Sequence, residues 1–162
     1  MSDNIHDFTE QEEDTQKGRF LTFLLGNETY GIDIQFVTEI IGIQPVTEVP
    51  ELPEYIRGII NLRGKIIPVM DVRLRFKKQF RQYNDRTCVV VVDIKDISIG
   101  LIVDSVVEVL SIADGEIVDP PDISRSGKKY IKGIGKVGKE VKMLLNCEQL
   151  LTEQDTNELI NL

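Results

Sequence analysis

The sequence predicts an all-β fold in which two small barrels, each of about five short strands, pack together and are followed by a short C-terminal helix. Three observations predict it. Short apolar runs rich in valine and isoleucine recur between glycine-containing turns, which is typical of small barrels. Four ordered sequence blocks occur twice along the chain. A unit of roughly 70 residues buries too little surface to be stable alone, so two copies are expected to pack against each other.

The repeat is clearest between segments 30–41 and 99–110, which align without a gap at an offset of 69 residues. Gly31 meets Gly100, Glu39 meets Glu108, and aliphatic residues meet at most other positions. Blocks 20–23 and 56–59 likewise fall on 89–92 and 131–134, the second pair at an offset of 75 residues. The expected organisation is a disordered acidic tail over 1–17, barrel copy one over about 18–86, barrel copy two over about 87–151, and a helix over 152–162.

The first strands of each copy are predicted by continuous apolar runs at 20–25 and 88–92, as expected for strands buried on both faces. Turn residues follow at 26–27 and 95–96. Segment 34–43 is ambiguous, because its apolar residues have helical spacing while its β-branched content favours a strand with a bulge.

Residues 61–64 are predicted to form a hairpin loop in which Gly64 takes a positive φ. Pro68 then argues for an edge strand or a bulge. Arg63 has no counterpart in the second copy, because residues 61–64 align with 136–138 only across a one-residue gap. It is either a solvated turn residue or a guanidinium that makes bidentate bonds to a carboxylate or peptide oxygens. Near the C-terminus, Thr152 and Asp155 are spaced like a helical capping box.

Composition argues against an exported, membrane-spanning or catalytic protein. The 162 residues include 19 basic and 27 acidic side chains, for a net charge of −8, and six of the acidic residues lie in the first 16 positions without a basic one. No apolar run approaches the roughly 18–20 residues that span a bilayer, and the N-terminus lacks a signal sequence, so a cytoplasmic protein is expected. His6 is the one histidine, Cys88 and Cys147 form no CxxC motif, and no phosphate-binding loop is present. We therefore expect no enzyme, no metal site and no cofactor.

Two motifs resemble a known family. The segment 30–40, YGIDIQFVTEI, followed by 56–73, IRGIINLRGKIIPVMDVR, closely resembles the bacterial chemotaxis coupling proteins of the CheW family. The block at 100–106, GLIVDSV, is similar to a third motif of that family, and the likeness extends over about 19–151. The resemblance implies two packed five-stranded SH3-like β-barrels without catalytic activity. It also implies an adaptor that links the cytoplasmic tip of methyl-accepting chemoreceptors to the regulatory domain of the histidine kinase CheA, recruited to receptor arrays at the inner face of the cytoplasmic membrane.

The resemblance also implies site residues. Receptor binding in the family uses the groove between the barrels, and the matching positions here are Ile34, Val37, Glu39, Arg63, Gly100, Val106 and Val109. A receptor tip is a helical hairpin, so an apolar stripe framed by charge suits it. We expect Arg63 and Glu39 to fix the helix register and to contact one another. The kinase-binding surface is expected around Val118 and Ile123.

Three alternatives remain at this point. A coupling protein with a fused receiver domain and the isolated regulatory domain of a kinase share the fold, but the chain length and the NLRG hairpin favour the simple adaptor. A small SH3-like nucleic-acid-binding protein would use the basic segment 73–86, with Phe76 or Tyr83 as a stacking face. Alternation of arginine with apolar residues in that segment also describes a strand with one solvated face. We expect no nucleic acid partner and no insertion into the membrane.

Overall fold

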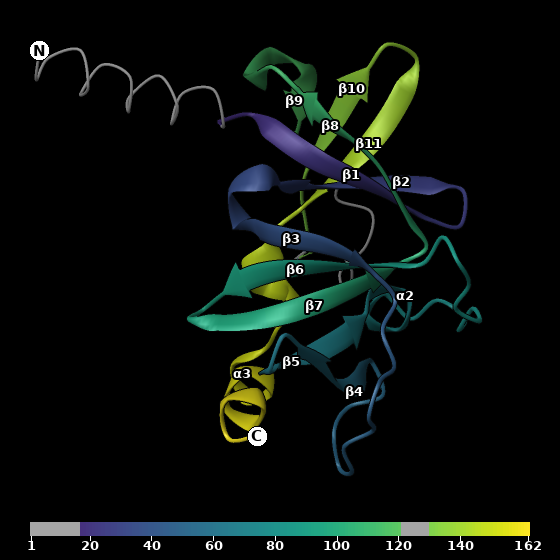
Figure 1. The fold of residues 1–162 in the computed structure, drawn as a ribbon. Coiled ribbons are helices and arrows are strands. Elements are labelled where there is room, and N and C mark those ends of the chain that lie inside the picture. The colour runs from purple at the N-terminus through teal and green to yellow at the C-terminus, as the bar shows by residue number, and fades with distance from the viewer. Residues whose placement is uncertain (1–16, 121–129) are drawn as a thin grey trace, which may run out of the picture.

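The computed structural model describes residues 17–120 and 130–162 of the chain, which form two antiparallel-rich β-sheets (Figure 1). In order across the sheet, the six-stranded sheet contains β8 (Ser105–Ser111), β1 (Arg19–Leu25), β2 (Glu28–Asp33), β11 (Glu140–Leu145), β10 (Ile131–Val137) and β9 (Ile117–Val118). The five-stranded sheet contains β3 (Val37–Gly42), β6 (Cys88–Ile94), β7 (Ile97–Val103), β5 (Lys65–Asp71) and β4 (Ile56–Leu62). The predicted all-β class with a short C-terminal helix is confirmed.

Both sheets close into barrels in the same way. After β3 the chain crosses to the far edge of its sheet, where Thr47 and Ile59 of β4 exchange two backbone hydrogen bonds of 2.9 Å. In the six-stranded sheet β8 leads through the 3-10 turn η2 (Asp114–Glu116) into β9, which pairs with β10. Each barrel also contains one parallel pair, β2 with β11 and β5 with β7. These matching features support an internal duplication.

The barrels do not follow the two predicted copies. The five-stranded barrel uses the continuous stretch from β3 to β7, whereas the six-stranded barrel joins β1 and β2 to β8, β9, β10 and β11. The chain passes between barrels through the 3-10 turn η1 (Ile34–Phe36) and again at Asp104. The expected boundary near residue 86 therefore falls inside the five-stranded barrel, between β5 and β6. Equivalent strands of the two copies have equally apolar faces, so the repeat alone does not determine whether they pair within a copy or between copies.

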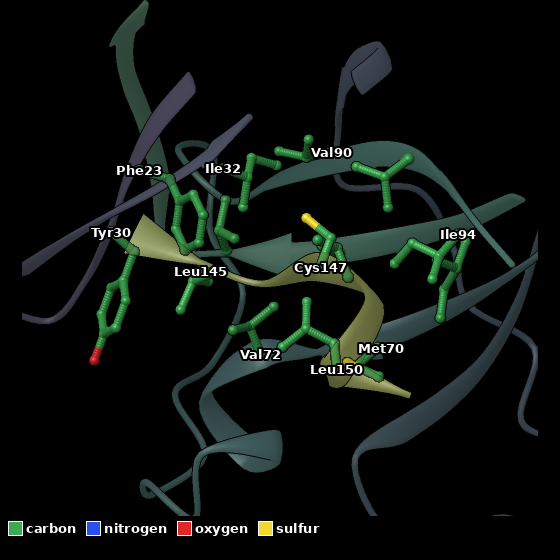
Figure 2. Packing of buried hydrophobic residues seen from close by; sticks show 14 of the residues in the cluster. Phe23, Tyr30, Ile32, Met70, Val72, Val90, Ile94, Leu145, Cys147 and Leu150 are labelled. Atoms are coloured by element: carbon green, nitrogen blue, oxygen red, sulfur yellow. The ribbon is translucent and has the colours of Figure 1, made fainter. Parts of the chain in front are cut away.

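Three apolar clusters explain why the first strands of each copy are continuously apolar. In β6, Val89 and Val91 point into the five-stranded barrel, and Val90 and Val92 point into a larger cluster shared by both sheets. A smaller cluster of Phe20, Ile112 and Leu144 fills the six-stranded barrel. Figure 2 shows side chains from both sheets meeting in the shared cluster: Phe23, Ile32 and Leu145 from one, Met70, Val90 and Ile94 from the other. The two barrels therefore share one core, as expected for units too small to be stable alone.

The structure settles three local predictions. Segment 34–43 is the 3-10 turn η1 followed by β3, whose register shifts between Val37 and Glu39, so the strand with a bulge is confirmed. The prediction from Pro68 of an edge strand or a bulge is wrong at that residue, because β5 lies inside its sheet and the register shift of the β4–β5 pair falls between Ile56 and Gly58, while Pro68 pairs regularly with Ile59. Pairing of β5 with β7 begins only at Val69, so the missing N–H of proline falls where β7 does not yet pair. The hairpin prediction is confirmed, with Arg63 and Gly64 as the two turn residues between paired Leu62 and Lys65.

The C-terminal helix α3 (Glu153–Ile160) begins with the predicted capping box, in which Thr152 and Asp155 exchange side-chain to backbone hydrogen bonds. Asp155 is buried and also accepts a 2.6 Å hydrogen bond from the hydroxyl of Tyr55. The short helix α2 (Val72–Arg75) and the 3-10 turn η4 (Cys147–Leu150) lie close by, where Arg75 Nε donates to the Leu150 carbonyl. These bonds fasten the C-terminus to the five-stranded barrel.

Candidate functional site

The most prominent polar feature of the five-stranded barrel is a bidentate ion pair between Arg63 and Glu39. Arg63 Nη1 and Nη2 donate to Glu39 Oε1 and Oε2 at 2.8 and 2.5 Å. The two hydrogen bonds lower the pKa of the Glu39 carboxyl and raise that of the guanidinium. The Arg63 side chain remains 70% exposed, so its other N–H groups face solvent. Exposed ion pairs contribute little to stability, so the main effect of this one is to orient an exposed guanidinium.

The β4–β5 hairpin holds Arg63 in an unusual backbone conformation. Its φ is 52°, and Gly64 follows at 84°, as a two-residue hairpin turn requires. The equivalent hairpin between β10 and β11 turns at Gly138, whose φ is 61°. Both hairpins align at the constant offset of 75 residues without a gap, so the predicted one-residue gap at Arg63 is wrong. The first copy carries arginine where the second carries glycine, and Arg63 is one of five non-glycine residues with a positive φ in the described ranges.

Three predicted apolar residues lie next to the two points where the chain crosses between the barrels. Ile34 lies in η1, Val37 begins β3, and Val106 follows the second crossing at Asp104. All three are half-buried and pack against the core cluster that the two sheets share. The junction between the barrels therefore presents partly exposed aliphatic side chains on both of its sides, which suits contact with an apolar helix face.

The remaining predicted residues have different surroundings. Val109 is 39% exposed on β8, and Val118 is 39% exposed on β9. Gly100 is buried in β7, where an added Cβ would lie 2.6 Å from Val89 Cγ1 and 3.0 Å from Val69 Cγ1. The structure therefore brings Arg63 to Glu39 and packs Ile34, Val37 and Val106 against the shared core, whereas Gly100 is buried and tightly packed. Ile123 lies outside the described residues.

The basic segment 73–86 is largely occupied by internal contacts. Arg73 and Arg81 both donate to Asp104 Oδ2, and Lys78 Nζ lies 2.6 Å from Glu28 Oε1. Arg75 is held between the rings of Tyr55 and Tyr130. The two proposed stacking faces are also engaged, because Phe76 packs between Tyr30 and Tyr130 and the Tyr83 hydroxyl donates to Asp71. Phe76 and the Tyr83 hydroxyl therefore take part in internal contacts of the fold.

The described residues place the two cysteines and the acidic side chains as follows. Within residues 17–120 and 130–162, no three His, Cys, Asp or Glu side chains come together as a metal site. Cys147 is buried in the shared core, where desolvation raises the pKa of its thiol to about 12 and disfavours the reactive thiolate (Figure 2). None of the described helices has the length and apolar character needed to cross a bilayer.

Sequence reasoning missed the hub at Asp104. Its carboxylate accepts from the Gly26 backbone N–H at 2.7 Å and from Arg73 and Arg81, so it joins the β1–β2 turn, α2 and the following loop. The signal was an acidic residue inside an otherwise apolar block, GLIVDSV, at the point where the chain changes barrels. A largely desolvated carboxylate, here 14% exposed, is stabilised by cationic partners, and Arg73 and Arg81 supply them.

The two closed sheets define a scaffold-type fold built from two SH3-like barrels. A model of the CheW-like domain matches residues 19–155. The chain is 38% identical over 137 residues to the chemotaxis protein CheW of Klebsiella aerogenes, covering 84% of this chain and 82% of that protein. It is 32% identical over 149 residues to CheW of Treponema pallidum, covering 89% and 88%. The solved structure of the scaffolding protein TtCheW from Thermoanaerobacter tengcongensis superposes with a TM-score of 0.77 at 37% identity, covering 82% of this chain and 91% of that one.

The chain belongs to the CheW-like domain family. The members named above are chemotaxis and scaffolding proteins, and the family is non-catalytic, so this protein is a chemotaxis scaffold and not an enzyme.

Proposed function

We propose that this protein couples methyl-accepting chemoreceptors to the histidine kinase CheA at receptor arrays on the inner face of the cytoplasmic membrane. The receptor's helical hairpin lies along the barrel junction and contacts Ile34, Val37 and Val106. Arg63, held by Glu39, contacts polar groups at the edge of the helix. Val109 extends the apolar contact along β8, and Gly100 keeps the sheet beneath it closely packed.

The observation that carries this proposal is the exposed Arg63–Glu39 ion pair on a strained hairpin turn. The second copy places glycine at the equivalent position, so the fold does not require arginine there. The carboxylate orients the guanidinium and leaves most of its surface open, at 70% exposure. A fixed guanidinium beside aliphatic side chains gives both register and affinity for an amphipathic helix.

The experiment is co-sedimentation of the full chain with receptor-containing membranes, with and without CheA. Arg63→Ala should abolish sedimentation with the receptor and leave the thermal unfolding midpoint unchanged. Lys78→Ala is the matched control, because it removes the cation of another surface ion pair, with Glu28. Normal binding by Arg63→Ala, or equal loss in the control, would contradict the proposal.

The charge-reversed pair Glu39→Arg with Arg63→Glu separates two roles of the ion pair. Reversal preserves the hairpin contact and inverts the charge that faces the receptor. If Arg63 contacts the receptor, the reversed pair should bind no better than Arg63→Ala. Restored binding would show instead that the ion pair acts only by holding the hairpin.

The kinase surface is proposed at Val118, with Ile123 beyond the described residues. Val118 is exposed on β9, the short strand that closes the six-stranded barrel. Val118→Glu should reduce co-sedimentation of CheA and leave receptor binding intact. Val141→Glu, at an exposed valine on β11, is the control for an added surface charge. Equal CheA recruitment by Val118→Glu and the unmodified protein would show that the kinase-binding surface lies elsewhere on the molecule.

A further inference from the structure

A second candidate site lies on the side of the molecule where the β1–β2 turn, the segment 81–87 and the β7–β8 crossing meet. These elements line a partly open pocket of about 240 Å³, which we call the cavity. Its charged lining consists of three arginines and two aspartates: Arg73, Arg81, Arg86, Asp71 and Asp104. None of these residues belongs to the receptor or kinase surfaces proposed above.

Both carboxylates of this cavity already have internal donors. Asp71 is 1% exposed and accepts from the Tyr83 hydroxyl at 2.7 Å and from the Leu74 N–H. Asp104 accepts three N–H groups at one oxygen, from Gly26, Arg73 and Arg81. The acidic side of the cavity is therefore occupied by the fold itself, and its capacity to attract a cation is small.

The guanidinium groups, in contrast, have N–H donors to spare. Each carries five N–H groups, of which Arg73 uses Nε and Nη1 and Arg81 uses Nη1. The Arg86 guanidinium makes no hydrogen bond or ion pair with any residue of the described ranges. Three cations against two satisfied carboxylates leave a net positive cavity with unpaired donors.

We propose that this cavity binds a small phosphate-bearing anion. Forked guanidinium donors match the paired oxygens of phosphate, and Arg81 and Arg86 would each contribute them. The volume corresponds to about eight water molecules and lies below the roughly 300–1,000 Å³ of sites for larger organic ligands. It suits inorganic phosphate or a short phosphomonoester. Because Asp104 and Ser105 lead directly into Val106, an occupied cavity borders the barrel junction.

The test is an NMR titration of the ¹⁵N-labelled full chain with inorganic phosphate at constant ionic strength. The amides of Gly26 and Thr87, which line the cavity, should shift and saturate, while that of Gly138 in the distant hairpin should not move. Arg86→Gln should weaken phosphate binding about tenfold without disturbing the rest of the spectrum, because it removes charged hydrogen bonds to the ligand. Arg19→Gln, the same charge change on an exposed strand end, should bind like the unmodified protein.

Three outcomes would overturn the inference. Shifts that chloride reproduces at equal ionic strength would show screening only. Equal phosphate binding by Arg86→Gln and Arg19→Gln would show that the cavity is not the phosphate-binding site. Binding of succinate in place of phosphate would refute phosphate as the ligand class.

Discussion

Gly100→Ala tests whether Gly100 serves the proposed receptor site by packing or by direct contact. The glycine sits in β7 between β5 and β6, and its Cα faces the interior of the five-stranded barrel. An added methyl group would lie 2.6 Å from Val89 Cγ1 and 3.0 Å from Val69 Cγ1. Both valines are 0% exposed, so neither has free space into which to move. Contacts this short force a shift of packed strands.

The expected cost follows from overpacking. Adding one methylene to a tightly packed core destabilises by about 1–3 kcal/mol. A chain of this size loses about 2–4 °C of unfolding midpoint for each kcal/mol. We therefore expect Gly100→Ala to melt about 2–12 °C lower. Gly115→Ala is the control, because no atom lies within 4 Å of its added Cβ, and its midpoint should be unchanged.

A double-mutant cycle with Val89→Ala identifies the clashing atom. Val89→Ala removes Cγ1 and should itself destabilise by about 1–3 kcal/mol through lost apolar contact. In the double variant the new methyl group occupies part of the vacated space, so the combined loss should fall short of the sum by about 0.5–3 kcal/mol. Urea unfolding measures all four proteins. Gly100→Ala that unfolds like the unmodified protein but fails to bind receptor would refute the packing role and indicate a direct contact.

Two further predictions concern single titratable groups. In the native protein at pH 8, iodoacetamide should label the partly exposed Cys88 and spare Cys147, because burial raises the pKa of the Cys147 thiol to about 12. Peptide mass spectrometry measures the extent of labelling at each cysteine. Rapid labelling of Cys147 without unfolding would contradict its position in the core. In carbon-detected NMR the Glu39 carboxyl should titrate with a pKa below its ordinary value of 4.5. Because this folded-state pKa is lowered, the ion pair should persist at neutral pH and be lost as the pH falls through the lowered pKa. Arg63→Gln should raise the titration midpoint of Glu39, and an unchanged titration midpoint would show that the pair is not populated in solution.

Local features of this fold could be predicted wherever chemistry within a few residues decides them. The capping box at Thr152 and Asp155 was predictable because both partners lie within one helical turn. The Arg63–Gly64 turn was predictable because few residues other than glycine accept positive φ. Continuous apolar runs correctly indicated strands buried on both faces, since β6 contributes to two clusters at once.

Features that depend on pairing between distant strands could not be predicted in the same way. Proline at position 68 is excluded only where a neighbouring strand needs its N–H, and that depends on where β7 begins to pair. Which strands belong to which barrel depends on the two points, η1 and Asp104, where the chain crosses between barrels. The pattern of apolar residues along the sequence does not distinguish these crossings from ordinary turns. The Asp104 hub has the same origin, because its partners lie 23 to 78 residues away in sequence.

The interleaved barrels impose an order on synthesis of the chain by the ribosome. All strands of the five-stranded barrel lie between Val37 and Val103, so this barrel has every partner as soon as that stretch has emerged. The β1–β2 hairpin emerges first but pairs in parallel with β11, where Tyr30 meets Met143, near the other end of the chain. The β1 edge gains its partner when β8 emerges, but the β2 edge stays unpaired until β11 is made, and unpaired strand edges promote aggregation. A nascent chain therefore carries a five-stranded sheet that has all its strand partners but only part of the shared core, beside a hairpin whose β2 edge is still open, and that edge is what a holding chaperone would need to shield.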